Sequence, residues 1–172
     1  MHRVVLDTNV VVSAVLSPKG IPAEVLKRCF SNFLQILCSS EILDEYKRVL
    51  SYGKLNIETY TQTGIIDAVR EASTFIVPTK STIVLPHESD RIFYDTAKTG
   101  EAVLITGNIK HFPNEPFIMT PSDFMREEIE SSKSIKGLEL IRDMRAEAQT
   151  RGFLTDEEIE AEVQTVRVEK KR

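Results

Sequence analysis

Short apolar runs alternate along the chain with segments in which apolar residues recur at helical spacing. The apolar runs predict five strands, at 3–10, 33–38, 75–77, 102–106 and 117–119. The helical pattern predicts helices over 22–30, 41–50, 57–72 and 90–99. Strands that alternate with helices form βαβ units and a mostly parallel sheet. We therefore predict an α/β fold, in which ligands bind at the C-terminal edges of the strands.

The pattern changes near residue 127. Residues 127–136 are polar and rich in serine, which is typical of a linker, and two narrow apolar stripes at helical spacing follow within 138–166. Two such helices bury too little apolar surface to be stable alone, so they must dock on another surface. We predict one domain over 1–126, followed by a linker and C-terminal helical extension over 127–172.

Composition narrows the class of protein. The 172 residues can form one substantial core, and no apolar run approaches the roughly 20 residues that span a bilayer. The chain starts without a secretory signal and has only Cys29 and Cys38, so we expect a cytoplasmic protein without a disulfide framework. Its net charge of −4 disfavours nucleic-acid binding through a basic surface. Bound cations at an acidic site could reverse the local field and still permit such binding.

The first polar residue of interest is Asp7, which directly follows the aliphatic residues 4–6. An ionised carboxylate is costly to bury without a partner, so Asp7 is expected at the sheet edge, facing a site. The alternative is that Asp7 only caps the turn that follows.

Two more acids occupy comparable positions. Glu45 borders the apolar face of the 41–50 helix and would need a cation there, although it could be an ordinary surface glutamate. Asp90 begins the next helix but one, where aspartate is also a favoured N-cap. We interpret Asp95 as a solvated residue rather than a supplementary acid. Thr106 and Asn108 flank a glycine after the fourth strand, either as a ligand-facing turn or as an everyday one.

Four motifs together resemble the PIN-domain family, most of all the toxin components of type II toxin–antitoxin modules. They are LDTN at 6–9, EILDEY at 41–46, DRIFY at 90–94 and TGNIKHF at 106–112, in the family's order and roughly its spacing. The resemblance covers about residues 1–125. It implies an α/β/α sandwich with a five-stranded parallel sheet, and an endoribonuclease that hydrolyses RNA phosphodiesters with Mg²⁺ or Mn²⁺.

The resemblance also assigns residues. Asp7, Glu45 and Asp90 match the family's three core acids, which would be both catalytic and metal-holding, with Asp7 as the central bridging ligand. Asn9 and Thr106 match its supporting polar positions. A metal bound there would activate a water molecule for attack on phosphorus.

One position departs from the family. Many members have an acid where this chain has Asn108, which offers an oxygen but no charge. A second metal would then be held only loosely. The alternative function is a catalytically weak PIN module that binds RNA or a protein. Phosphohydrolases with an aspartate nucleophile fit less well, because they need a second acid where this chain has Asn9.

The resemblance further implies partners: an RNA substrate, an antitoxin protein and a second copy in a homodimer. The C-terminal extension is similar to the toxin-neutralising helices of antitoxins, so it could shield the acidic site of this or a neighbouring chain. Arginine suits bidentate contact with carboxylates. The candidate inhibitory contacts are Arg142, Arg145, Arg151 and Arg167. Alternatively, the extension completes the core or a dimer interface.

Overall fold

The computed structural model describes residues 2–131. The predicted helices of the C-terminal extension, with the four arginines named above, lie outside the described residues. Residues Met1–Glu127 form one compact unit, which contains the sheet and its helices.

The centre of this unit is a five-stranded sheet in which every neighbouring pair is parallel. Its strand order is β3-β2-β1-β4-β5, so β1 lies in the middle. The strands are β1 (His2–Leu6), β2 (Leu34–Cys38), β3 (Ser73–Phe75), β4 (Val103–Ile105) and β5 (Ile118–Met119). The parallel α/β fold predicted from the alternation of strands and helices is confirmed.

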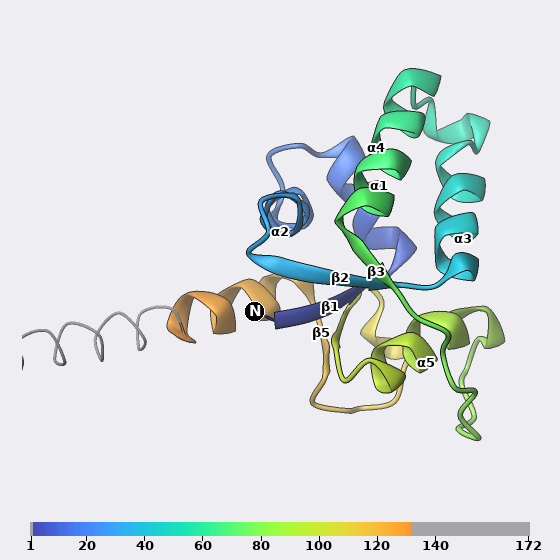
Figure 1. The fold of residues 1–172 in the computed structure, drawn as a ribbon, viewed down its shortest axis with the longest axis vertical. Helices are drawn as coiled ribbons and strands as arrows, with labels where there is room; N and C mark the ends of the chain where they lie inside the picture. The colour runs from blue at the N-terminus through green and yellow to red at the C-terminus, as the bar shows by residue number, and fades with distance from the viewer. Residues whose placement is uncertain (1, 132–172) are drawn as a thin grey trace, which may run out of the picture. The chain divides into compact units, whose positions relative to one another are not determined.

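Helices cover both faces of this sheet, as Figure 1 shows: α1, α2 and α4 lie on one side and α5 on the other. The helices are α1 (Thr8–Leu16), α2 (Ile21–Phe30), α3 (Ser40–Leu50), α4 (Thr59–Ala72) and α5 (Arg91–Thr99). Three short 3-10 helices are η1 (Gly53–Leu55), η2 (Glu88–Asp90) and η3 (Ile109–His111), and residues 121–131 are also helical. In residues 2–131, no helix combines the length and apolar character needed to cross a membrane.

The structure corrects the first predicted element. The apolar run was expected to be a strand as far as residue 10, but β1 ends at Leu6 and α1 begins at Thr8. Asp7 separates them in extended conformation, with φ −68° and ψ 149°, and its side chain accepts a hydrogen bond from Asn9 N. Valine favours strands only weakly. Val10 and Val11 belong to α1 and are buried there, so tertiary packing overrides their local preference for a strand.

Two other boundaries follow from local chemistry. Ser39 is the N-cap of α3, because its hydroxyl accepts a hydrogen bond from Ile42 N at 3.3 Å. The third strand lies two residues earlier than expected, at Ser73–Phe75, and Val77 beyond it is 91% exposed. Val77 was included in the predicted strand because it is apolar, but it does not pack against the core.

Candidate active site

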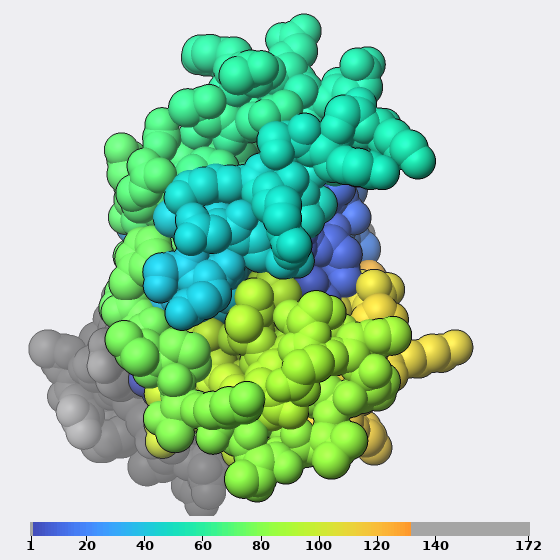
Figure 2. All heavy atoms as spheres, turned by 90° about the vertical axis from the view of Figure 1, so that its right-hand side faces the viewer, coloured from blue at the N-terminus to red at the C-terminus, as the bar shows by residue number. Residues whose placement is uncertain are grey.

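The site begins where β1 and β4 end side by side. Asp7 N donates to Ile105 O at 2.9 Å, which continues the sheet pairing by one residue. The fully buried Thr106 hydroxyl then donates to Asp7 Oδ2 at 2.6 Å. Two residues 99 positions apart are thus joined because parallel neighbouring strands end at one edge. Figure 2 faces this edge, with blue residues of the α1 region between the cyan residues of α3 and the yellow-green residues of α5.

Asn9 braces the same corner. Its Nδ2 donates to Asp7 Oδ2 at 2.8 Å, and its Oδ1 accepts from Gly107 N at 2.9 Å. A Cβ on Gly107 would lie 3.2 Å from Asn9 Oδ1, so glycine permits this close approach. Asn108 N donates to the Thr106 hydroxyl at 2.9 Å. Asn9 and Thr106 therefore hold the Asp7 carboxylate in one orientation.

Asp7 is in an unfavourable place for a charge. Its exposed fraction is only 8%, and burial is the main cause that raises its pKa above the ordinary value. The Thr106 and Asn9 hydrogen bonds lower the pKa, while the negative charge of Asp90 raises it again. Oδ2 accepts both short bonds, whereas Oδ1 accepts only a 3.5 Å bond from Asn9 N. Oδ1 therefore retains capacity for a further partner.

Asp90 lies across the pocket at the start of α5. It occupies the N-cap position, but its side chain makes no capping hydrogen bond. Its Oδ2 instead contacts His111 Nδ1 at 3.0 Å. Asp7, Asp90, Asn108 and His111 line one pocket of about 360 Å³. The structure therefore brings two of the three predicted acids together.

Glu45 lies just outside this pocket. The Tyr46 hydroxyl donates to Leu6 O, which holds α3 against the end of β1. Glu45 accepts a 3.4 Å hydrogen bond from the Thr8 hydroxyl and pairs with Arg48. Within residues 2–131, no three His, Cys, Asp or Glu side chains gather closely enough to hold a metal ion as a group. The third predicted acid is thus a near neighbour of the pocket rather than part of its wall.

Asp95 differs from its sequence interpretation. We expected a solvated residue, but Asp95 is only 4% exposed and its Oδ1 accepts from Ser81 N at 3.2 Å. Arg91, one helical turn earlier, donates to the carbonyls of Ser81 and Ile83 at 2.9 and 2.7 Å. Together Arg91 and Asp95 fasten the preceding loop to α5, and that loop leads to Asp90.

Sequence reasoning assigned no role to three residues that the structure places at or beside the site. His111 was in the quoted TGNIKHF motif, and its position beside Asp90 was not evident from the spacing. The His87 ring packs against the His111 ring at a tilt of 56°, with ring centroids 4.4 Å apart. Tyr52 lines the pocket from the turn after α3 and carried no sequence signal.

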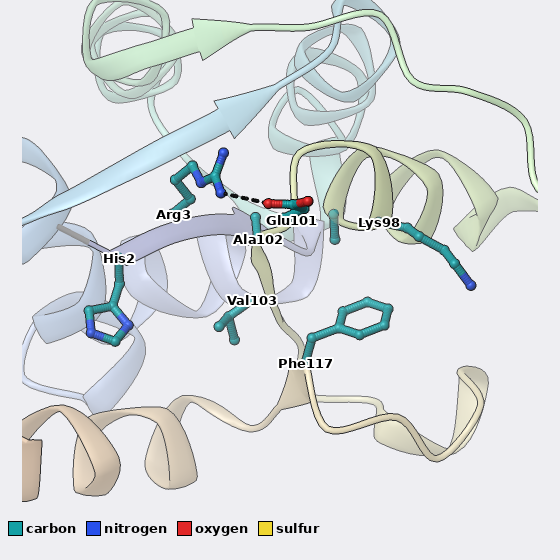
Figure 3. A pocket seen from close by; sticks show the side chains of 8 residues that line it. His2, Arg3, Lys98, Glu101, Ala102, Val103 and Phe117 are labelled. Carbon is teal, nitrogen blue, oxygen red and sulfur yellow. Dashed lines mark hydrogen bonds and ion pairs between the residues drawn. The ribbon is translucent and has the colours of Figure 1, made fainter.

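A second hollow of about 560 Å³ lies where β1 and β4 begin (Figure 3). Arg3 pairs there with Glu101 at 3.3 Å, beside Lys98 and Phe117. It contains none of the predicted site residues. The larger hollow is therefore separate from the clustered carboxylates.

The protein is a parallel α/β domain with two carboxylates in a pocket at the C-terminal edge of the sheet. Comparisons with known proteins agree with this class of fold and site. A family model of the PIN domain matches residues 3–110, and the chain belongs to this family, as its motifs predicted. PIN domains are generally nucleases and typically use divalent metal ions. An uncharacterized protein of Methanocaldococcus jannaschii, MJ1680, is 31% identical over 109 residues, which cover 62% of this chain and 70% of that protein.

Among solved structures, the chain is similar to VapBC2 from Rickettsia felis, crystallised bound to a DNA fragment from its promoter. The TM-score is 0.46 and the sequence identity 21%. The match covers 69% of this chain and 96% of that one.

Proposed function

We propose that this protein is a metal-dependent ribonuclease that hydrolyses RNA phosphodiesters with Mg²⁺ or Mn²⁺. The observation that carries the proposal is that Asp7 and Asp90, on different elements, line one pocket. No lysine or arginine among the described residues lines that pocket. The negative charge of Asp90 contributes to the raised pKa of Asp7, and a divalent cation bound between the two carboxylates would stabilise the ionised form of Asp7.

The donor chemistry fits such a cation. Magnesium prefers oxygen ligands, and Asp7, Asp90 and the Asn108 amide all offer oxygen. Glu45 would join them once its ion pair with Arg48 opens. That pair is weakly held, because the Arg48 side chain is 74% exposed and such pairs contribute about 0–1 kcal/mol. Asn108 adds no charge, which favours one firmly held ion.

The chain's own residues prepare this site. Thr106 and Asn9 hold Asp7 Oδ2, which leaves Oδ1 for the ion. His111 holds Asp90 Oδ2 and orients that carboxylate. When bound, the ion would supply a Lewis acid that activates water and neutralises phosphate charge. The residues around it keep the ligands in place, which typically accounts for a 10–100-fold effect on metal affinity or activity.

The finer role that we propose is that of a toxin in a toxin–antitoxin module, active in the cytoplasm. It rests on the motif resemblance of residues 1–125. The proposed partners are RNA, an antitoxin, a second copy of the chain, and the protein's own 127–172 extension as an inhibitor. Comparing RNA cleavage by residues 1–130 with that by the full chain tests self-inhibition. Equal activity would reject it.

One observation favours a second candidate, a catalytically weak PIN module that binds RNA or protein. Asn108 stands where many members have an acid, and Glu45 pairs with Arg48 outside the pocket wall. Such a module would bind without cutting.

Cleavage assays separate the two functions. We expect the purified full chain to cut RNA in Mg²⁺ and not in EDTA, and we expect Asp7→Asn and Asp90→Asn to abolish cutting. Asp44→Asn is the matched control, because Asp44 is an exposed acid of α3 paired with Lys47. Metal-independent cutting, or full activity of Asp7→Asn, would contradict the nuclease proposal.

A further inference from the structure

The lining of the pocket that contains Asp7 and Asp90 combines two chemically different groups of residues. One group presents carboxylates and amides. The other group is mainly apolar and consists of Val12, Val49, Tyr52 and Leu55. A ligand that contacts both groups must join an anionic part to a flat or apolar one. A nucleotide has this character, because its phosphate is charged and its base has an apolar face.

Tyr52 is the aromatic residue in the apolar part of the lining, and its backbone is well held. Tyr52 N donates to Val49 O at 3.0 Å, and Tyr52 O accepts from Leu55 N at 2.9 Å. The side chain nevertheless stays 55% exposed instead of packing into the core. A half-exposed ring on a well-held backbone, in the same pocket as two carboxylates, is available to stack on a ligand.

Lys54 places a positive charge beside Tyr52, outside the lining of the pocket. Its Nζ lies 5.9 Å from the centroid of the Tyr52 ring. This distance is within the range of a weak cation–π contact. Proteins that bind single-stranded nucleic acids combine aromatic rings with positive charges, because a base stacks on the ring while the phosphate contacts the cation.

We propose that Tyr52 is a nucleobase-stacking residue that positions the nucleotide next to the scissile phosphate. Val49 and Leu55 complete the subsite, and Lys54 contacts the neighbouring phosphate. This inference rests on the proposed ribonuclease function, since it takes the Asp7 and Asp90 carboxylates as the place of cleavage. The volume of about 360 Å³ is within the usual range of small-ligand sites. Stacking tolerates any base, so Tyr52 selects unpaired nucleotides rather than one sequence.

The first test measures binding apart from cleavage. The full chain carrying Asp7→Asn is titrated into a fluorescein-labelled, single-stranded 12-mer of uridine, and anisotropy is recorded in Mg²⁺. Adding Tyr52→Ala should weaken binding by about 5- to 150-fold, and Tyr52→Phe by no more than about threefold. Tyr60→Ala is the matched control, because Tyr60 is 88% exposed on α4 and does not line the pocket. Equal affinity of the Tyr52→Ala and Tyr60→Ala proteins, or no binding at all, would overturn the proposal.

The second test reports stacking directly. The chain contains no tryptophan, so Tyr52→Trp introduces a single indole fluorophore at the subsite. Its emission should be quenched by the uridine 12-mer and not by a base-free 12-mer of the same backbone, while Tyr60→Trp should respond to neither. Quenching by both oligomers would mean that the backbone alone is recognised, and the stacking role would be rejected.

The two proposals fail in different ways. If the wild-type chain cuts no RNA but stacking depends on Tyr52, the nuclease function is wrong and the subsite stands. If RNA is cut and Tyr52→Ala changes neither KM nor binding, the subsite is wrong and the nuclease stands.

Discussion

Replacing Thr106 with valine removes one hydroxyl and keeps the shape of the side chain. That hydroxyl is fully buried and donates to Asp7 Oδ2 at 2.6 Å. It also accepts a hydrogen bond from Asn108 N, which lies at an exposed position where water can replace it. The perturbation therefore acts mainly on the Asp7 carboxylate.

The expected loss follows from the charge of the acceptor. A hydrogen bond to a charged group contributes about 1.5–3 kcal/mol, against about 0.5–1.5 kcal/mol for a neutral pair. Thr106→Val should therefore lower the free energy of unfolding by about 2 kcal/mol at neutral pH. Thr96→Val is a matched control. The Thr96 hydroxyl is also buried and donates at 2.6 Å, but to the neutral Ile92 carbonyl, so about 1 kcal/mol is expected.

The effect should depend on pH. Burial raises the pKa of Asp7 in the folded protein above its value in the unfolded chain. The protonated side chain therefore favours folding at pH values below the pKa of the unfolded chain. This contribution is lost as the pH rises through the pKa of the folded protein. The Thr106 hydrogen bond lowers that pKa and offsets part of the loss. The gap between wild type and Thr106→Val should therefore widen as pH rises through the folded pKa of Asp7.

Urea denaturation followed by circular dichroism, in EDTA, measures this gap between pH 3.5 and 8. We expect the Thr106→Val deficit to be larger at pH 8 than at pH 3.5, and the Thr96→Val deficit to stay constant. Equal, pH-independent deficits for both variants would show that the Thr106 hydroxyl does not stabilise an ionised Asp7.

Three further outcomes follow from burial. Asp7→Asn should raise the free energy of unfolding of the metal-free protein at pH 7, because the raised pKa of Asp7 means that its ionisation opposes folding. The gain should vanish at low pH, and a variant less stable than the wild type at pH 7 would contradict this. Burial raises the pKa of both Cys29 and Cys38 to about 12. Ellman's reagent at pH 8 should therefore label neither thiol until urea is added. Rapid labelling of the native protein would refute this prediction. Gly100→Ala should lower the free energy of unfolding in urea by about 1–3 kcal/mol, because the new Cβ would lie 2.2 Å from Leu37 Cδ1. An unchanged urea midpoint would show that the Leu37 side chain moves freely.

The sequence pattern predicted most of the architecture because burial leaves a periodic signal. The parallel sheet and the helices over 21–30, 40–50, 59–72 and 91–99 follow from the spacing of apolar residues. Helix α1 was missed because its valines favour a strand locally, and only packing against α2 and α3 decides otherwise. A single sequence does not contain that packing.

The site was harder to predict than the fold. Asp7 was evident because a carboxylate after a buried strand is costly. Asp90 was assigned by the motif resemblance, because its position before a helix is explained equally well by N-capping. Asp95 was misread because its partner, the Ser81 backbone, is a loop amide with no side-chain signal. His111 and Tyr52 come to the pocket from turns, where no periodicity places a side chain.

The most direct test of a metal site built by Asp7 and Asp90 is a Mn²⁺ titration followed by electron paramagnetic resonance. The full chain is compared with Asp7→Asn, Asp90→Asn and the exposed control Asp44→Asn. We predict one firmly bound ion in the wild-type and Asp44→Asn proteins, and its loss in both of the others. Unchanged Mn²⁺ binding in Asp7→Asn and Asp90→Asn, or none in the wild type, would contradict the proposed site.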